Sequence, residues 1–386
     1  MISTLIVVLC LIIGGVSHVI YGIQNTLKED LELEKQLRLI NKPPVKSIYT
    51  EFGDIVDCID INKQPAFDHP LLKHHKLQRK PSFEKTNAKT SPTRSIFGLD
   101  KNICPSGTVP IRRTTKDDLI REKSLLNDDI MTQKAPGIHL AEVSLKSRYG
   151  PYYGVSGRNS IYNPRLNRTD QISLSNLWVQ NGEGDAGNKI SFGWHVHPYL
   201  YGDDATYFYS TWTSDNYKRT GCYNIRCPGF VQTSKGNYLG ASISNTSIYG
   251  GIMVVADLSI FQDLVTKNWW LQVDGKNFGY FPAALFSNLA SADQVGGGGR
   301  TRTPPGTPSP PMGSGHFPDN IIVHACYFSF VSFRDASGKN HGPEVNQVKS
   351  FTDNSHCYGV KYYGYIPKRN IGYFLQFGGP GGNCGD

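Results

Sequence analysis

From Tyr149 to the C-terminus the chain is a series of short alternating runs, separated by Gly, Asn, Asp and Pro. Ile172–Val179 and Thr206–Thr213 both alternate with a period of two, which is the period of a strand with one buried face. Aromatic and β-branched residues, which favour strands, are frequent in these runs. Many short strands of this kind predict an all-β fold, a β-sandwich over residues 149–386.

Two segments interrupt this pattern. Residues 282–290 begin with proline and place Leu285, Phe286 and Leu289 on one helical face, which predicts one short helix. Residues 296–311 start with four glycines and continue with many prolines. Because such a sequence has few side chains with which to hold a strand, we expect a mobile loop there.

The N-terminus carries an apolar run at residues 5–16, with small residues at Gly15–Ser17. A dozen apolar residues are too few to span a bilayer, and small residues of this kind precede the cleavage site of a secretory signal. We predict a signal peptide over residues 1–22, secretion, and no integral membrane span after cleavage. The alternative is an uncleaved anchor, if the apolar stretch continues through Val19–Tyr21.

The charge balance constrains the class of partner. The chain has 40 Lys and Arg against 32 Asp and Glu, a formal net charge of +8. This balance favours anionic partners such as acidic polysaccharides, but no basic run is dense enough to indicate nucleic-acid binding. The sequons at Asn167 and Asn245 predict N-glycosylation, which agrees with secretion.

Eight cysteines are present, and Cys10 lies in the predicted signal peptide. An oxidising compartment is expected to pair most of the others. Cys326 is left over in an apolar segment and is expected to be a buried small hydrophobe rather than a reactive thiol. The predicted disulfides are Cys58–Cys104, Cys222–Cys227 and Cys357–Cys384.

Several motifs along the chain are too long to match by chance. They are Val56–Lys73, Cys104–Arg113, Gly193–Pro198, Thr220–Thr233 and Met312–Pro318. These motifs resemble the neprosin family of plant secreted proteins, whose characterised enzymes are glutamic peptidases that cleave after proline. The resemblance implies a zymogen, with an activation-peptide-like region at residues 23–140 and an antiparallel, glutamic-peptidase-like β-sandwich at residues 149–386.

The resemblance also implies two catalytic glutamates, one to take a proton from water and one to stabilise the oxyanion and the leaving amine. Residues 185–342 contain no glutamate. Matching Ile190–Trp194 to the family motif Ile-Glu-Ala-Gly-Trp places Ser191 at the first position. Matching residues 296–300 to Trp-Gly-Gly-Glu-Val places Gly299 at the second. Since a serine without an adjacent base is a poor proton acceptor, we predict a pseudoenzyme with no intact catalytic residue.

Other interpretations remain open. The protein is an active prolyl endopeptidase if Asp185 or Asp293 supplies a substitute carboxylate, or if residues 296–311 reflect an error in the gene structure. His195 and His197 share a strand face as metal ligands do, but no third ligand is evident, so we predict neither a metal nor a cofactor. The favoured hypothesis is a binding role, in which an intact proline-accepting groove holds proline-rich peptides or proteins.

Overall fold

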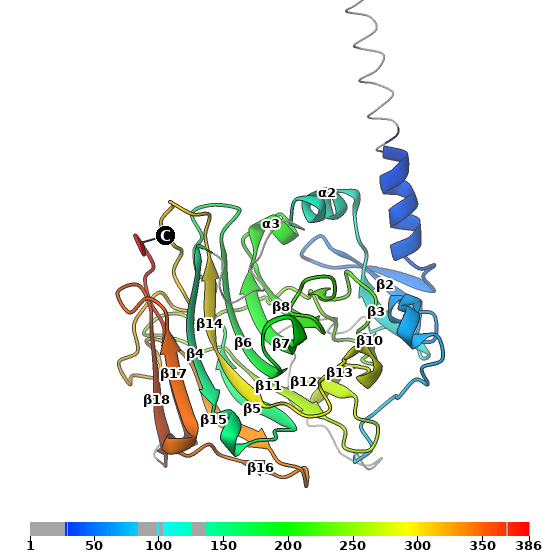
Figure 1. The fold of residues 1–386 in the computed structure, drawn as a ribbon. Coiled ribbons are helices and arrows are strands. Elements are labelled where there is room, and N and C mark those ends of the chain that lie inside the picture. Colours follow the sequence, from blue (N-terminus) through cyan, green and yellow to red (C-terminus); the bar gives the residue numbers. More distant parts are fainter. Residues whose placement is uncertain are drawn as a thin grey trace, which may run out of the picture.

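The computed structural model describes residues 28, 30–83, 99, 103–125, 136–367 and 370–385 (Figure 1). The predicted signal peptide lies outside these residues. None of the helices found within them is long and apolar enough to cross a bilayer. Residues 30–40 are helical, and the other α-helices are α2 (Lys116–Leu125) and α3 (Pro198–Tyr201).

Two antiparallel sheets with a common core form the body of the molecule, which confirms the predicted all-β, antiparallel sandwich. The first is seven-stranded, in the order β17-β4-β14-β6-β7-β8-β9. Its strands are β4 (Ile138–Leu145), β6 (Ile172–Asn181), β7 (Asn188–Val196), β8 (Thr206–Thr213), β9 (Cys222–Tyr223), β14 (Gln294–Arg302) and β17 (Val348–Thr352).

The second sheet is nine-stranded, in the order β10-β13-β12-β11-β5-β15-β19-β18, with β16 beside β15. Its strands are β5 (Gly154–Ser160), β10 (Val231–Gln232), β11 (Val255–Gln262), β12 (Trp269–Val273), β13 (Lys276–Phe281), β15 (Cys326–Arg334), β16 (Asn340–His341), β18 (Gly359–Ile366) and β19 (Gly372–Gly378). Short 3-10 turns occupy Pro65–Asp68, Pro70–Leu72, Ser147–Tyr149, Gly184–Ala186, Ala283–Leu285 and Val345–Gln347.

Strand β7 shows how the sequence pattern divides the two faces of the seven-stranded sheet. Ile190, Phe192 and Trp194 are fully buried in the core between the sheets. The Trp194 indole Nε1 donates a hydrogen bond to the Ser160 carbonyl oxygen of β5 at 3.0 Å, which joins the two sheets. Because side chains alternate along a strand, the residues between them, including Ser191, face the opposite side of the sheet.

The predicted mobile loop at residues 296–311 is wrong for its first half, because β14 is a central strand. It pairs with β6 along its full length and with β4 from Gly296 to Arg302. The glycines permit this close approach: a Cβ on Gly296 would lie 2.5 Å from the Val143 carbonyl oxygen and 2.6 Å from the Trp178 ring. Neighbouring strands, rather than the side chains of β14, therefore hold it in place.

The predicted helix at residues 282–290 is also wrong beyond one 3-10 turn, Ala283–Leu285. Phe286 is already extended, with φ −110° and ψ 133°. The Asn188 Oδ1 atom accepts hydrogen bonds from the backbone N–H groups of Ser287 (3.0 Å) and Asn288 (3.2 Å). These bonds draw the chain onto β7 instead of continuing the helix.

The N-terminal region forms a separate three-stranded sheet of β1 (Lys46–Tyr49), β2 (Ile55–Asp60) and β3 (Thr108–Arg112). It lies beside β10 and β13 of the sandwich (Figure 1). The His75 ring Nε2 is 2.8 Å from the Tyr280 hydroxyl, and Gln64 Nε2 donates to the Gln232 carbonyl oxygen at 3.1 Å. Polar contacts thus dock this region on the edge of the nine-stranded sheet.

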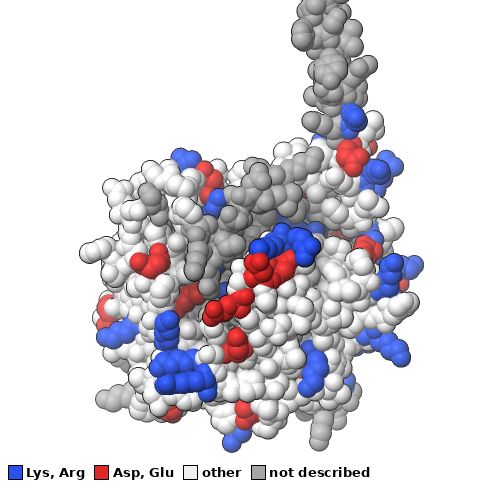
Figure 2. Space-filling view, viewed as in Figure 1, with Lys and Arg blue, Asp and Glu red and all other residues white. Residues whose placement is uncertain are grey.

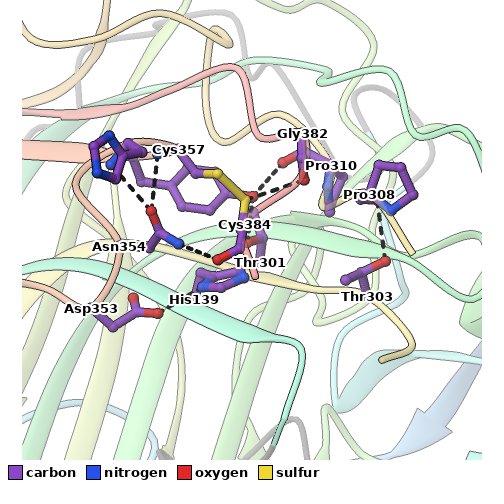
Figure 3. Close-up of a disulfide and its surroundings, with 12 residues drawn as sticks. His139, Thr301, Thr303, Pro308, Pro310, Asp353, Asn354, Cys357, Gly382 and Cys384 are labelled. Carbon is purple, nitrogen blue, oxygen red and sulfur yellow. Dashed lines mark hydrogen bonds and ion pairs between the residues drawn. A yellow bond between two sulfur atoms is a disulfide. The ribbon is translucent and has the colours of Figure 1, made fainter. Parts of the chain in front are cut away.

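The structure contains all three predicted disulfides, and Cys326 is free and buried as predicted. Figure 3 shows how Cys357–Cys384 ties the C-terminal tail beside β4 and β14. Next to it, His139 Nδ1 and the Asp353 carboxylate are 2.6 Å apart, which fixes the end of β17 to β4. Asn167 and Asn245 are both exposed, and their glycosylation stays a prediction.

Candidate functional site

Ser191 faces a small polar pocket on the outer face of the seven-stranded sheet. Neighbouring strands supply its lining, which includes Asn176 of β6, Lys189 of β7, Tyr209 of β8, Tyr223 of β9 and Arg300 of β14. Its volume of about 10 Å³ is room for about one water molecule. The pocket therefore brings together groups from five strands around the first of the two predicted positions.

Gly299, the second predicted position, lies on the other face of the sheet. A Cβ on Gly299 would be 2.6 Å from both the Met312 sulfur and the Phe377 ring, which belong to the core between the sheets. Arg300, one residue later, lines the pocket instead. The structure therefore does not bring Ser191 and Gly299 together. A run of four glycines contains no side chain that could mark which position faces outward.

Glu142 is a carboxylate that the sequence argument missed. It lies on β4 directly opposite Gly298, which is on the outer face of β14. Its carboxylate accepts from an Arg300 Nη atom at 3.4 Å, and both side chains are at most 7% exposed. Glu142 lies upstream of residues 185–342, the segment without glutamate that contains both motif positions. The one sequence feature that could have indicated a role for Glu142 is its place as a single acidic residue in the mainly apolar strand Ile138–Leu145.

Lys189 is the second cation of the pocket and is only 8% exposed. Its Nζ atom lies 4.7 Å from the centre of the Trp178 ring. Burial lowers the pKa of Lys189 to about 8, an effect that the Arg300 charge reinforces and the Glu142 charge opposes. Among the residues that the structure describes, no carboxylate forms an ion pair with Lys189.

His195 and His197 lie within an aromatic cluster beside this pocket. The His195 ring stacks on Tyr209 with centroids 4.2 Å apart, and its Nε2 is 3.0 Å from the Tyr201 hydroxyl. Burial lowers the pKa of both histidines, that of His197 to about 3. Over the described parts of the chain, no three His, Cys, Asp or Glu residues come together as metal ligands would.

These histidines predict a loss of stability in acid. The unfolded chain takes up a proton on His197 below about pH 6.5, whereas the folded protein stays neutral there until about pH 3. Stability therefore falls between these two values, by about 2 kcal/mol for His197 alone between pH 8 and pH 5. Urea denaturation of the protein and of His197→Gln at both pH values measures this. An equal acid loss in the variant would contradict the assignment.

The two carboxylates considered as substitutes lie elsewhere. Asp185 is at the surface, 73% exposed, and pairs with Lys218 at 2.5 Å. Asp293 accepts a hydrogen bond from the Gly182 N–H at 3.2 Å. Neither lines the pocket that contains Ser191. Glu142 is instead the carboxylate whose charge acts on Lys189, and it is paired with Arg300.

Comparison with known proteins identifies the family. The Neprosin family model matches residues 169–380, which is more than half of the chain, and the Neprosin activation peptide model matches residues 47–150. The chain belongs to the neprosin family. The residues that line the pocket thus lie within the neprosin match, whereas Glu142 lies within the activation-peptide match. The three-stranded N-terminal sheet, β3 included, falls almost entirely within the activation-peptide match.

Three solved structures of peptidases are also similar. Two are crystal structures of Scytalido-glutamic peptidase with transition-state analogues, and the third is SCP-B, a member of the Eqolisin family, with the tripeptide Ala-Ile-His. Each is 8% identical and covers 63% of this chain and 98% of its own, with TM-scores of 0.34, 0.32 and 0.33 respectively. With TM-scores this low, the likeness does not bear on the site of this neprosin-family protein.

Proposed function

We propose that this neprosin-family protein is a secreted pseudoenzyme that binds proline-rich peptides or proteins without cleaving them. The observation that carries the proposal is the charge of the pocket around Ser191. Its charged lining residues are the cations Lys189 and Arg300, and the Glu142 carboxylate pairs with Arg300 from outside the lining. A peptidase that works with two carboxylates needs one of them ionised and free to accept a proton from water.

The chemistry of each group supports the loss of activity. The Ser191 hydroxyl has no hydrogen bond to a histidine or carboxylate among the described residues, so it has no base to activate it. The Glu142 carboxylate is buried and already paired with the Arg300 guanidinium, so it is not free to position a water molecule. Two groups that act as a unit are thus both missing, and the loss of such a unit removes nearly the whole rate enhancement.

The proposed binding of proline-rich chains rests on the aromatic side chains around the pocket, because the cavity itself has room for only about one water molecule. Tyr209, Tyr217 and Tyr223 surround it on the β8–β9 side. Aromatic faces are the surfaces against which proline-rich segments dock in other recognition modules. On the face seen in Figure 2, basic and acidic side chains adjoin near the centre instead of forming one broad basic area.

The activity prediction is tested on the secreted protein after incubation in acid, with a fluorogenic peptide that contains proline. We expect no cleavage above the rate of the peptide alone. Glu142→Gln serves as the matched variant, because it removes the carboxylate that pairs with Arg300 of the pocket. Cleavage that disappears in Glu142→Gln would overturn the proposal and establish an active peptidase with Glu142 as the substitute carboxylate.

The binding prediction is tested by fluorescence anisotropy with a labelled proline-rich peptide and a matched peptide in which alanine replaces each proline. We expect the proline-rich peptide to bind at least about tenfold more tightly, a difference of about 1.4 kcal/mol. Equal affinities would contradict a proline-accepting site.

A further inference from the structure

The Lys189 ammonium has neither a carboxylate nor a hydrogen-bond acceptor as a partner among the described residues. Its side chain is more than nine-tenths buried, and it lines the pocket beside Ser191 and Thr211. The Trp178 ring covers one side of the ammonium at 4.7 Å. Glu142, the carboxylate whose charge acts on Lys189, is bound to Arg300. A buried ammonium that is not paired is costly, so this arrangement favours an anion from outside the described residues.

Two further polar groups of the pocket are also unsatisfied. The Tyr223 hydroxyl and the Asn176 Oδ1 atom are buried and make no hydrogen bond with any described residue. Burial raises the pKa of Tyr223 well above its usual value, so its hydroxyl keeps its proton and remains a donor. The Tyr209 hydroxyl accepts from Asn176 Nδ2 at 3.0 Å, which leaves its own proton to donate. The pocket thus offers an ammonium and two phenol donors.

We propose that this pocket binds one carboxylate group, with Lys189 as the charge partner and Tyr209 and Tyr223 as hydrogen-bond donors. The cavity of about 10 Å³ has room for about one water molecule, so one carboxylate oxygen would take the place of that water while the rest of the ligand stays outside. The carboxylate is either the C-terminus of a peptide or an acidic side chain. This inference deepens the proposed function. It rests on the proposed function only in assuming that the ligand is a peptide.

The simplest alternative is that Lys189 is a structural residue held by the Trp178 ring alone. The two hypotheses differ in how replacing Lys189 by a neutral residue changes ligand affinity. A structural cation–π contact does not discriminate between a ligand that carries a carboxylate and the same ligand with an amide. A carboxylate site does, and it loses this discrimination when the lysine loses its charge.

The experiment measures the affinity of the full-length protein for four peptides by calorimetric titration at pH 6. The probes are N-acetyl-Ala-Pro, its C-terminal amide, N-acetyl-Glu-Pro-amide and N-acetyl-Ala-Ala. We expect N-acetyl-Ala-Pro or N-acetyl-Glu-Pro-amide to bind at least about tenfold more tightly than N-acetyl-Ala-Pro-amide. Tighter binding of the first indicates a site for a C-terminal carboxylate, and tighter binding of the second indicates a site for a side-chain carboxylate. Equal affinity of all proline peptides would overturn the inference and leave the proposed function intact.

Two variants complete the test. Lys189→Met is expected to remove the preference for the carboxylate, whereas Lys349→Met, at an exposed lysine of β17, is expected to retain it. If Lys189→Met does not fold, the pH dependence replaces it. Binding of the carboxylate is then expected to weaken between pH 7 and pH 9, because the pKa of Lys189 is about 8, while binding of the amide stays constant. A carboxylate preference that survives in Lys189→Met or at pH 9 would overturn the inference.

Failure of the proposed function gives a different result. If N-acetyl-Ala-Ala binds as tightly as N-acetyl-Ala-Pro and loses its affinity in Lys189→Met, the carboxylate site stands and the preference for proline fails. If none of the four probes binds, both proposals fail.

Discussion

Replacing Gly299 by glutamate is expected to destabilise the protein by at least about 4 kcal/mol, instead of restoring a catalytic carboxylate. The new side chain would start 2.6 Å from the Met312 sulfur and from the Phe377 ring. Both neighbours are fully buried, so the carboxylate would enter an apolar core without a hydrogen-bond partner. Urea denaturation at pH 7 measures the loss, and loss of secretion is its extreme form.

Ser191→Glu is the matched control for this prediction, because it adds the same side chain on the opposite face of the sheet. Its carboxylate would enter the pocket that Lys189 and Arg300 line. Crowding in so small a cavity is expected to cost about 1–3 kcal/mol, which attraction to the two cations partly offsets. Equal stability of the two variants would show that Gly299 and Ser191 do not face opposite sides of the sheet.

The sequence predicted those parts of the molecule that local patterns determine. The period of two in Ile172–Val179 and Thr206–Thr213 corresponds to β6 and β8. The three disulfides join cysteines 46, 5 and 27 residues apart, and each pair lies within one region of the chain. The sequence motif identified Ser191 as the first family position, and the structure places its neighbours Phe192 and Trp194 in the core.

The parts that were missed depend on contacts between distant residues. Strand β14 has no side chains to show its register at Gly296–Gly299, and its position is set by pairing with β4 and β6. The same pairing brings Glu142 to Arg300 across 158 residues. The two residues are too far apart in the sequence for a local motif to contain both. A glutamate far upstream therefore contributes to a site whose motif residues lie far downstream.

The ion pair of Glu142 and Arg300 yields the second large prediction. Arg300→Met is expected to cost about 3–5 kcal/mol, because it leaves the Glu142 carboxylate buried without its cation. The double variant Glu142→Gln/Arg300→Met is expected to recover most of this loss, since no unpaired charge remains. Urea denaturation of the single and double variants gives the coupling energy directly.

An exposed ion pair provides the reference for this measurement. Arg168 and Asp170 are 2.8 Å apart but 50% and 36% exposed, so Arg168→Met is expected to change stability by at most about 1 kcal/mol. If Arg300→Met costs no more than this, water reaches the Glu142–Arg300 pair in solution. Glu142 would then be accessible to water, and the case for an inactive site would weaken. A large cost, recovered in the double variant, would instead show that the carboxylate is buried and held by Arg300, which is the arrangement least suited to general-base catalysis.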